Sequence, residues 1–144
     1  MKRLYIHAVL AVWFPLAEVS ALPVRDSLAM VETGAKDARR SAADSVRGAA
    51  GEVSRFQILP SVWRQYSSSH DYENPEVAWT VAERILTERT KWFHQETGRE
   101  PTALELYLLW HKPTTFKTAG FSASRVKALY KQRAERFANL VASS

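Results

Sequence analysis

The 144-residue chain contains no cysteine, so disulfides, thiol nucleophiles and thiolate metal ligands are all excluded. Its four histidines include no pair at i and i+4 spacing, and its five glycines form no phosphate-binding loop. We therefore expect no metal site and no nucleotide or other cofactor. A folded domain of this chain must be held together by packing alone.

Long hydrophobic runs are also absent beyond the N-terminus. The apolar stretch Leu4–Leu16 follows the basic start MKR and is shorter than the ~18 residues that a membrane span needs. Val19 and Ala21 occupy the positions that a signal peptidase reads. The sequence thus predicts a signal peptide over residues 1–21, cleavage after Ala21, and export to the periplasm or the medium. An N-terminal anchor or a buried helix is the alternative.

Cleavage would leave residues 22–144, a length that suits one domain with one core. The formal charge of the whole chain is +5, a balance that suits an anionic partner such as a cell wall or a nucleic acid. The basic residues are dispersed among acidic neighbours and form no basic run. We therefore expect no nucleic-acid partner. The oligomeric state is not indicated.

Apolar residues recur with helical spacing and no strand-period run of useful length occurs, so the sequence predicts an all-α fold. The predicted helices are 22–33, a short stretch beginning at Pro60, 75–96, 103–111, and a final segment capped by Ser122 or Ser124. Between the first two lies 35–51, which has no large apolar residue except Val46. We expect a loop there, with a short β-hairpin or a helical turn.

Several helix boundaries carry explicit signals. Asn74 and Pro75 form an N-cap followed by a first-turn proline, and Gly98 is placed to end that helix. The segment 103–111 is apolar on nearly every side and should be the most buried helix, stopped at Pro113. The final helix is expected to turn the following residues inward: Val126, Leu129, Tyr130, Phe137, Leu140 and Val141.

Glu32 is the residue best placed for acid chemistry. It follows Leu28 by one helical turn, at the edge of the apolar stripe and in the last turn of its predicted helix. Burial and the negative end of the helix dipole both disfavour a carboxylate, so the pKa of Glu32 should be raised. A carboxyl group that stays protonated near neutral pH can protonate a glycosidic oxygen.

The order of landmarks along the chain extends this interpretation. A helical Glu32-Thr33 is followed by Gly51-Glu52-Val53-Ser54-Arg55-Phe56-Gln57-Ile58, by Pro60, and later by Trp110-His111-Lys112-Pro113. This order resembles the lysozyme-like superfamily of lytic transglycosylases and goose-type lysozymes, over roughly residues 24–130. Ser54 replaces the glycine usual in that family, and Trp110–Pro113 keeps only the aromatic character of its Tyr-Asn-Ala-Gly motif.

The resemblance implies a lysozyme-like helical domain around a buried central helix, which cleaves β-1,4 bonds of peptidoglycan with Glu32 as general acid. Substrate contacts are expected from Gln57, Ser54, Trp110 and Tyr130. Glu32 and Gln57 should then converge on one cleft. His111 is interpreted as a core or surface histidine.

The reaction type is open at this stage. An inverting hydrolase needs a second carboxylate roughly 6.5–9.5 Å from the acid, for which Glu52 and Asp44 are the candidates, whereas a lytic transglycosylase needs one acid only. A non-catalytic glycan-binding or structural domain is the main competing interpretation, favoured by the altered Trp110–Pro113 motif. A basic helical nucleic-acid-binding module is a second.

Overall fold

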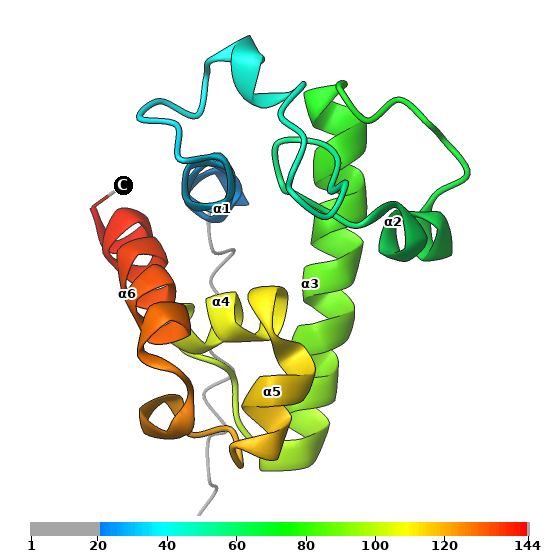
Figure 1. The fold of residues 1–144 in the computed structure, drawn as a ribbon. Helices are drawn as coiled ribbons and strands as arrows, with labels where there is room; N and C mark the ends of the chain where they lie inside the picture. The colour runs from blue at the N-terminus through cyan, green and yellow to red at the C-terminus, as the bar shows by residue number, and fades with distance from the viewer. Residues whose placement is uncertain (1–20, 144) are drawn as a thin grey trace, which may run out of the picture.

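A computed structural model describes residues 21–143 (Figure 1), and within them the chain is all-α, as predicted. The helices are α1 (Ala21–Thr33), α2 (Pro60–Tyr66), α3 (Pro75–Thr97), α4 (Ala103–His111), α5 (Pro113–Thr118) and α6 (Ala128–Ala142), with short 3₁₀ turns at Ser41–Ala43 (η1) and Ala123–Arg125 (η2). The expected signal peptide lies outside the described residues except for Ala21, at which α1 begins.

Helix α3 has the ends that the sequence predicts. The Asn74 side chain accepts hydrogen bonds from the backbone N–H groups of Glu76 and Val77, at 3.0 and 3.2 Å, and Pro75 follows in the first turn. Gly98 ends the helix with a left-handed φ of 73°, which glycine adopts without steric cost. The inner face of α3 forms much of the core through Ala78, Val81, Ala82, Ile85, Leu86 and Phe93.

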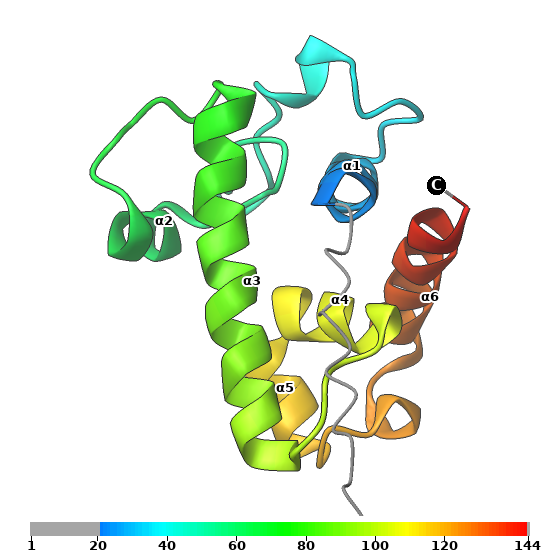
Figure 2. The same ribbon diagram turned by 180° about the vertical axis from the view of Figure 1, so that it is seen from behind.

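Helix α4 is the central helix, and five of its nine residues are buried, the highest proportion of any helix in residues 24–143. Tyr107, Leu108 and Leu109 are fully buried. A capping box between Thr102 and Glu105 satisfies the first N–H groups of the helix. Figures 1 and 2 show α4 lying between α3 and α6, with which it packs. The prediction of a buried central helix is confirmed.

The chain beyond α4 departs from the prediction. Pro113 does not simply stop a helix but begins α5, because a proline in the first turn lacks an N–H that has no partner there anyway. The predicted cap at Ser122 or Ser124 is wrong: their hydroxyls bond one another at 2.9 Å beside η2, and α6 begins after Lys127 without a side-chain cap. Leu129, expected to face inward, is 63% exposed.

The arrangement brings the two ends of the described chain together. Helix α1 packs against α6, and the segment 34–59 passes from the end of α1 across to α3 (Figure 1). In α2 the large Trp63 is fully buried, and its indole N–H donates to the carbonyl of Ser69 at 2.8 Å. This hydrogen bond joins α2 to the loop that follows it.

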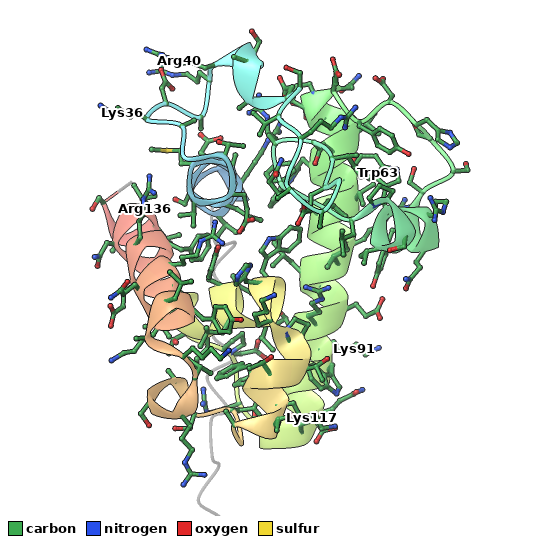
Figure 3. All side chains as sticks on the ribbon, viewed as in Figure 1. Lys36, Arg40, Trp63, Lys91, Lys117 and Arg136 are labelled. Carbon is green, nitrogen blue, oxygen red and sulfur yellow. The ribbon has the colours of Figure 1, made fainter. Side chains whose placement is uncertain are left out.

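Many charged side chains lie outside this core, as Figure 3 shows for five basic residues. These exposed residues come from the loop after α1, from α3, from α5 and from α6, namely Lys36, Arg40, Lys91, Lys117 and Arg136. The dispersion expected from the sequence therefore persists in the fold. Among residues 21–143, no helix combines the length and apolar character required to cross a membrane.

Candidate active site

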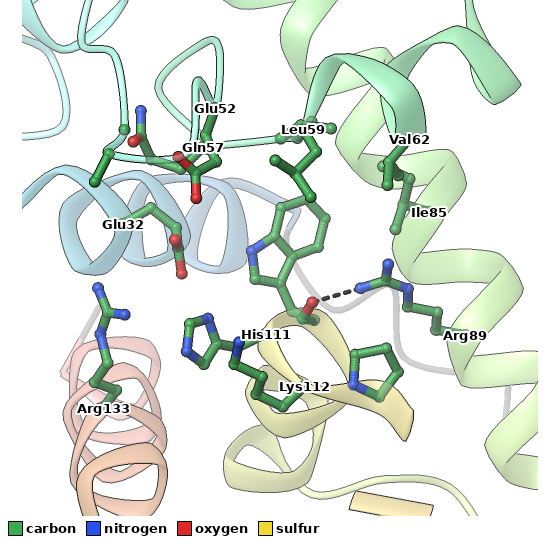
Figure 4. Close-up of a pocket in the computed structure, with 15 residues that line it drawn as sticks. Glu32, Glu52, Gln57, Leu59, Val62, Ile85, Arg89, His111, Lys112 and Arg133 are labelled. Carbon is green, nitrogen blue, oxygen red and sulfur yellow. Dashed lines mark hydrogen bonds between the residues drawn. The ribbon is translucent and has the colours of Figure 1, made fainter. Parts of the chain in front are cut away.

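Glu32 stands in the last turn of α1, at the wall of a cleft of about 470 Å³. The helix ends there because Gly34 takes a φ of 73° and the Thr33 hydroxyl donates back to the carbonyl of Ala29 at 2.7 Å. The cleft is bounded by α1, the loop before α2, α3, α4 and α6 (Figure 4). It is lined by Glu32, Gly48, Ala49, Glu52, Gln57, Ile58, Leu59, Val62, Ile85, Arg89, Trp110, His111, Lys112, Pro113 and Arg133.

The Glu32 carboxyl group is held by α4. The phenol of the fully buried Tyr107 donates a hydrogen bond of 2.6 Å to Oε1 of Glu32. Burial raises the pKa of Glu32, and Glu52 raises it further through charge repulsion. The Tyr107 hydrogen bond and the positive charge of Arg133 act in the opposite direction, but burial is the largest effect. The raised pKa expected from the sequence is therefore present.

Tyr107→Phe tests this balance directly. Removing the phenol takes away a hydrogen bond that favours the carboxylate, so the pKa of Glu32 should rise further. A carbon-13 NMR titration of the Glu32 side chain measures the shift. Tyr66→Phe is the matched control, because the Tyr66 phenol also bonds a glutamate, Glu88, and neither residue lines the cleft. An unchanged Glu32 titration would contradict the importance of this hydrogen bond.

Gln57 reaches the same cleft from a tight turn. The backbones of Val53 and Ile58 exchange two hydrogen bonds of 2.8 and 2.9 Å, and Ser54 and Gln57 take left-handed φ values of 64° and 51°. Fully buried Phe56 anchors the turn against Trp79, with ring centroids 5.7 Å apart. Glu32 and Gln57 therefore converge on one cleft, as expected from the motif order.

The amide group of Gln57 is used differently from the expectation. Its Nε2 donates to the carbonyls of Val46 and Ser54, at 3.0 and 2.9 Å, so both of its donors are engaged by the backbone. The Gln57 side chain thus stabilises the loop, and its carbonyl oxygen is the group available to a ligand.

The same loop positions Glu52 at the cleft. Its Oε2 accepts a hydrogen bond of 2.9 Å from the backbone N–H of Ala50. A Cβ atom on Gly48 would lie 2.0 Å from Oε2 of Glu52 and 2.7 Å from Oε1 of Gln57. Glycine at position 48 thus allows both side chains to fold over the loop, opposite Glu32 (Figure 4).

Three further lining residues come from the end of α4. Trp110 is mostly buried, and its carbonyl accepts a hydrogen bond from Arg89 of α3, whose guanidinium also lies over the Trp110 ring at 5.8 Å. The His111 ring stacks on the Tyr107 ring, with ring centroids 5.7 Å apart. Lys112 lies over the Tyr130 ring at 5.5 Å. The α4 wall of the cleft is thus aromatic and basic.

The remaining predicted site residues do not line the cleft, and three expectations need correction. Asp44 is buried in an ion pair with Arg55, so it cannot activate water beside Glu32. Ser54 is fully buried, and its hydroxyl accepts from the Phe56 N–H at 3.2 Å. Tyr130 lies behind the wall, packed edge-on against His111 at 5.5 Å.

Sequence reasoning missed several residues that the fold brings to this site. Tyr107 was expected only as part of the apolar segment 103–111, His111 as a core or surface residue, and Arg133 was given no role. A basic residue on α6 gives no local signal that it faces a cleft. The signal for Tyr107 was a phenol in a segment expected to be buried, since a buried hydroxyl needs a partner.

Within residues 21–143, no group of three or more histidine, aspartate or glutamate side chains is positioned to hold a metal ion. Comparisons with protein-family models, with curated proteins and with solved structures give no match to the chain. The function must therefore be inferred from the site itself.

Proposed function

We propose that the protein cleaves the β-1,4 glycosidic bond of peptidoglycan or a related glycan, with Glu32 as general acid, in a lysozyme-like domain. The observation that carries the proposal is a carboxyl group of raised pKa at the wall of an open cleft, held by the Tyr107 phenol. The order of Glu32, the Gln57 turn and the α4 wall along the chain supports it.

The chemistry follows from the protonation state of Glu32. The protonated carboxyl group gives its proton to the glycosidic oxygen as the bond from that oxygen to the sugar C1 breaks, and positive charge develops on the sugar ring. Tyr107 bonds Oε1, which leaves Oε2 to carry the proton towards the substrate. The resulting carboxylate is stabilised by the same phenol and by Arg133.

The charge of the cleft fits an anionic glycan. Arg89, Lys112 and Arg133 contribute positive charge to the lining, and with Glu32 protonated only Glu52 opposes it. Peptidoglycan carries carboxylates on its peptide stems, which such a cleft attracts. The predicted signal peptide would deliver the protein to the compartment that holds this polymer.

Mass spectrometry of peptidoglycan digested with residues 22–144 tests the proposal. Soluble fragments with new reducing ends show hydrolysis, and fragments with anhydro ends show that a sugar hydroxyl replaced water. Binding to the polymer without release of fragments would overturn the catalytic proposal and favour the glycan-binding alternative.

Glu52→Gln is expected to lower the cleavage rate by less than about tenfold, well below the loss typical of a catalytic acid or base. The Glu52 carboxylate is bonded to the loop through Ala50, and its influence on Glu32 is the repulsion that raises the pKa. Removing the Glu52 charge should lower the pKa of Glu32. The alkaline limb of the pH–activity profile should therefore move to a slightly lower pH. A loss comparable to that of Glu32→Gln would instead assign Glu52 the activation of water.

A further inference from the structure

The imidazole of His111 occupies the α4 wall of the cleft, on the other side of the cleft from the turn that carries Glu52 and Gln57. Figure 4 shows it below the Glu32 carboxyl group, which points down from α1 towards it. The ring is held from behind by the Tyr107 ring and from the side by the Tyr130 ring, at 5.7 and 5.5 Å. Aromatic packing on two sides fixes its orientation.

No hydrogen bond engages the imidazole nitrogens of His111 within residues 21–143. The ring is thus held by packing and keeps its nitrogens available to a ligand. This differs from Gln57, whose amide donors are both occupied by backbone carbonyls.

We propose that His111 is the proton acceptor of the cleavage reaction, working opposite the acid Glu32. The inference rests on the proposed function and adds to it the second catalytic group. As the bond between C1 and the leaving oxygen breaks, Glu32 supplies a proton to that oxygen. The attacking oxygen, of water or of a sugar hydroxyl, bonds to C1 and passes its proton to a nitrogen of His111. The imidazolium then releases that proton to solvent, and Glu32 takes one up.

The charged groups around His111 favour the free base. Burial lowers the pKa of His111 to about 4, and the positive charges of Arg133 from α6 and of Lys112 beside it lower it as well. The other titratable groups nearby are Glu32 from α1, Tyr107 from α4, Tyr130 from α6 and Glu52 across the cleft. An imidazole of this basicity is comparable to the carboxylate that serves as base in other glycosidases.

The order of the two pKa values suits a pair of catalytic groups. The pKa of His111 is about 4, whereas that of Glu32 is raised above its usual 4.5. Between those values the base is deprotonated while the acid is protonated, which is the state that the reaction requires. A neutral base also adds no charge that would alter the pKa of Glu32.

The pH dependence of kcat and KM on peptidoglycan, measured from about pH 3 to about pH 8, tests the assignment in three proteins. The wild type should lose activity below a pH of about 4, as His111 becomes protonated. His111→Gln should lower kcat by roughly 10²–10⁴-fold with little change in KM, and its residual activity should lack that acid limb. His70→Gln, an exposed histidine outside the cleft, should match the wild type.

The outcomes separate the two proposals. If the wild type releases no fragments, the proposed function and this inference both fail. If cleavage is lost in Glu32→Gln but His111→Gln keeps the rate and the acid limb, the inference fails alone. Nitrogen-15 NMR titration of wild-type His111, with and without a β-1,4-linked N-acetylglucosamine trimer, gives a readout that does not depend on how the variant folds. An ordinary pKa near 6.5, or no response to the trimer, would also overturn it.

Discussion

Glu32→Gln should lower glycan cleavage by roughly 10²–10⁴-fold, the contribution typical of general acid catalysis. The amide has nearly the size of the acid and keeps an oxygen that accepts the Tyr107 hydrogen bond, but it has no proton to donate. Sugar binding should therefore persist while kcat falls. Fragment release from peptidoglycan measures the rate, and binding of the intact polymer measures affinity.

The stability of this variant has a pH dependence of its own. Because burial raises the pKa of Glu32, the folded wild type is penalised once the carboxyl group ionises, as the pH rises from about 4.5 through the raised value. Glu32→Gln should match the wild type in thermal stability below that range and exceed it slightly above. Glu83→Gln, an exposed change on α3, serves as control. Equal cleavage by Glu32→Gln and an active wild type would exclude Glu32 as the acid.

Asp44→Ala should destabilise the fold by about 3–5 kcal/mol, because it leaves a buried guanidinium without its counter-charge. Arg55 bonds both carboxylate oxygens of Asp44, at 2.5 and 3.0 Å, and its Nη1 donates to the carbonyl of Ala38 at 2.7 Å. The Arg55 side chain is 7% exposed and that of Asp44 is 11% exposed. Urea denaturation followed by circular dichroism measures the loss.

Two controls isolate the ion pair. Asp37→Ala removes a carboxylate from the same connection, but Arg39 is exposed and Asp37 is about half-exposed, so stability should be nearly unchanged. Asp44→Ala combined with Arg55→Met removes both charges and should recover part of the lost stability. If Asp44→Ala alone abolished cleavage without affecting unfolding, Asp44 would be a catalytic residue after all.

Regular patterns made most of the helices predictable. The 3.6-residue period placed α1 and α3, and the apolar character of residues 103–111 on nearly every side placed α4. The residues Asn74, Pro75 and Gly98 marked the ends of α3 because each acts through local backbone geometry. The start of α6 was missed because no side chain caps it, so no residue type could announce it. Leu129 was wrongly expected to face inward: it lies in the first turn of α6 with 63% of its surface exposed.

The candidate site was predictable only in part. Glu32 and Gln57 were found through a motif order, and each sits where local backbone geometry leaves it beside the cleft. Tyr107, His111 and Arg133 join them by long-range packing, which depends on how α4 and α6 meet α1. Asp44 was misassigned because its partner is decided by the fold: Arg55, eleven residues away, turns into the core to meet it.

The packing of α1 on α6 also sets the stage of synthesis at which the cleft can form. Glu32 leaves the ribosome more than a hundred residues before the last turns of α6, yet α1 packs on α6 and Arg133 of α6 lines the cleft beside Glu32. Contacts so distant along the chain form only after both partners have emerged, and closing so long a loop slows folding. A chain shortened before α6 would therefore carry Glu32 without the α6 wall of its cleft.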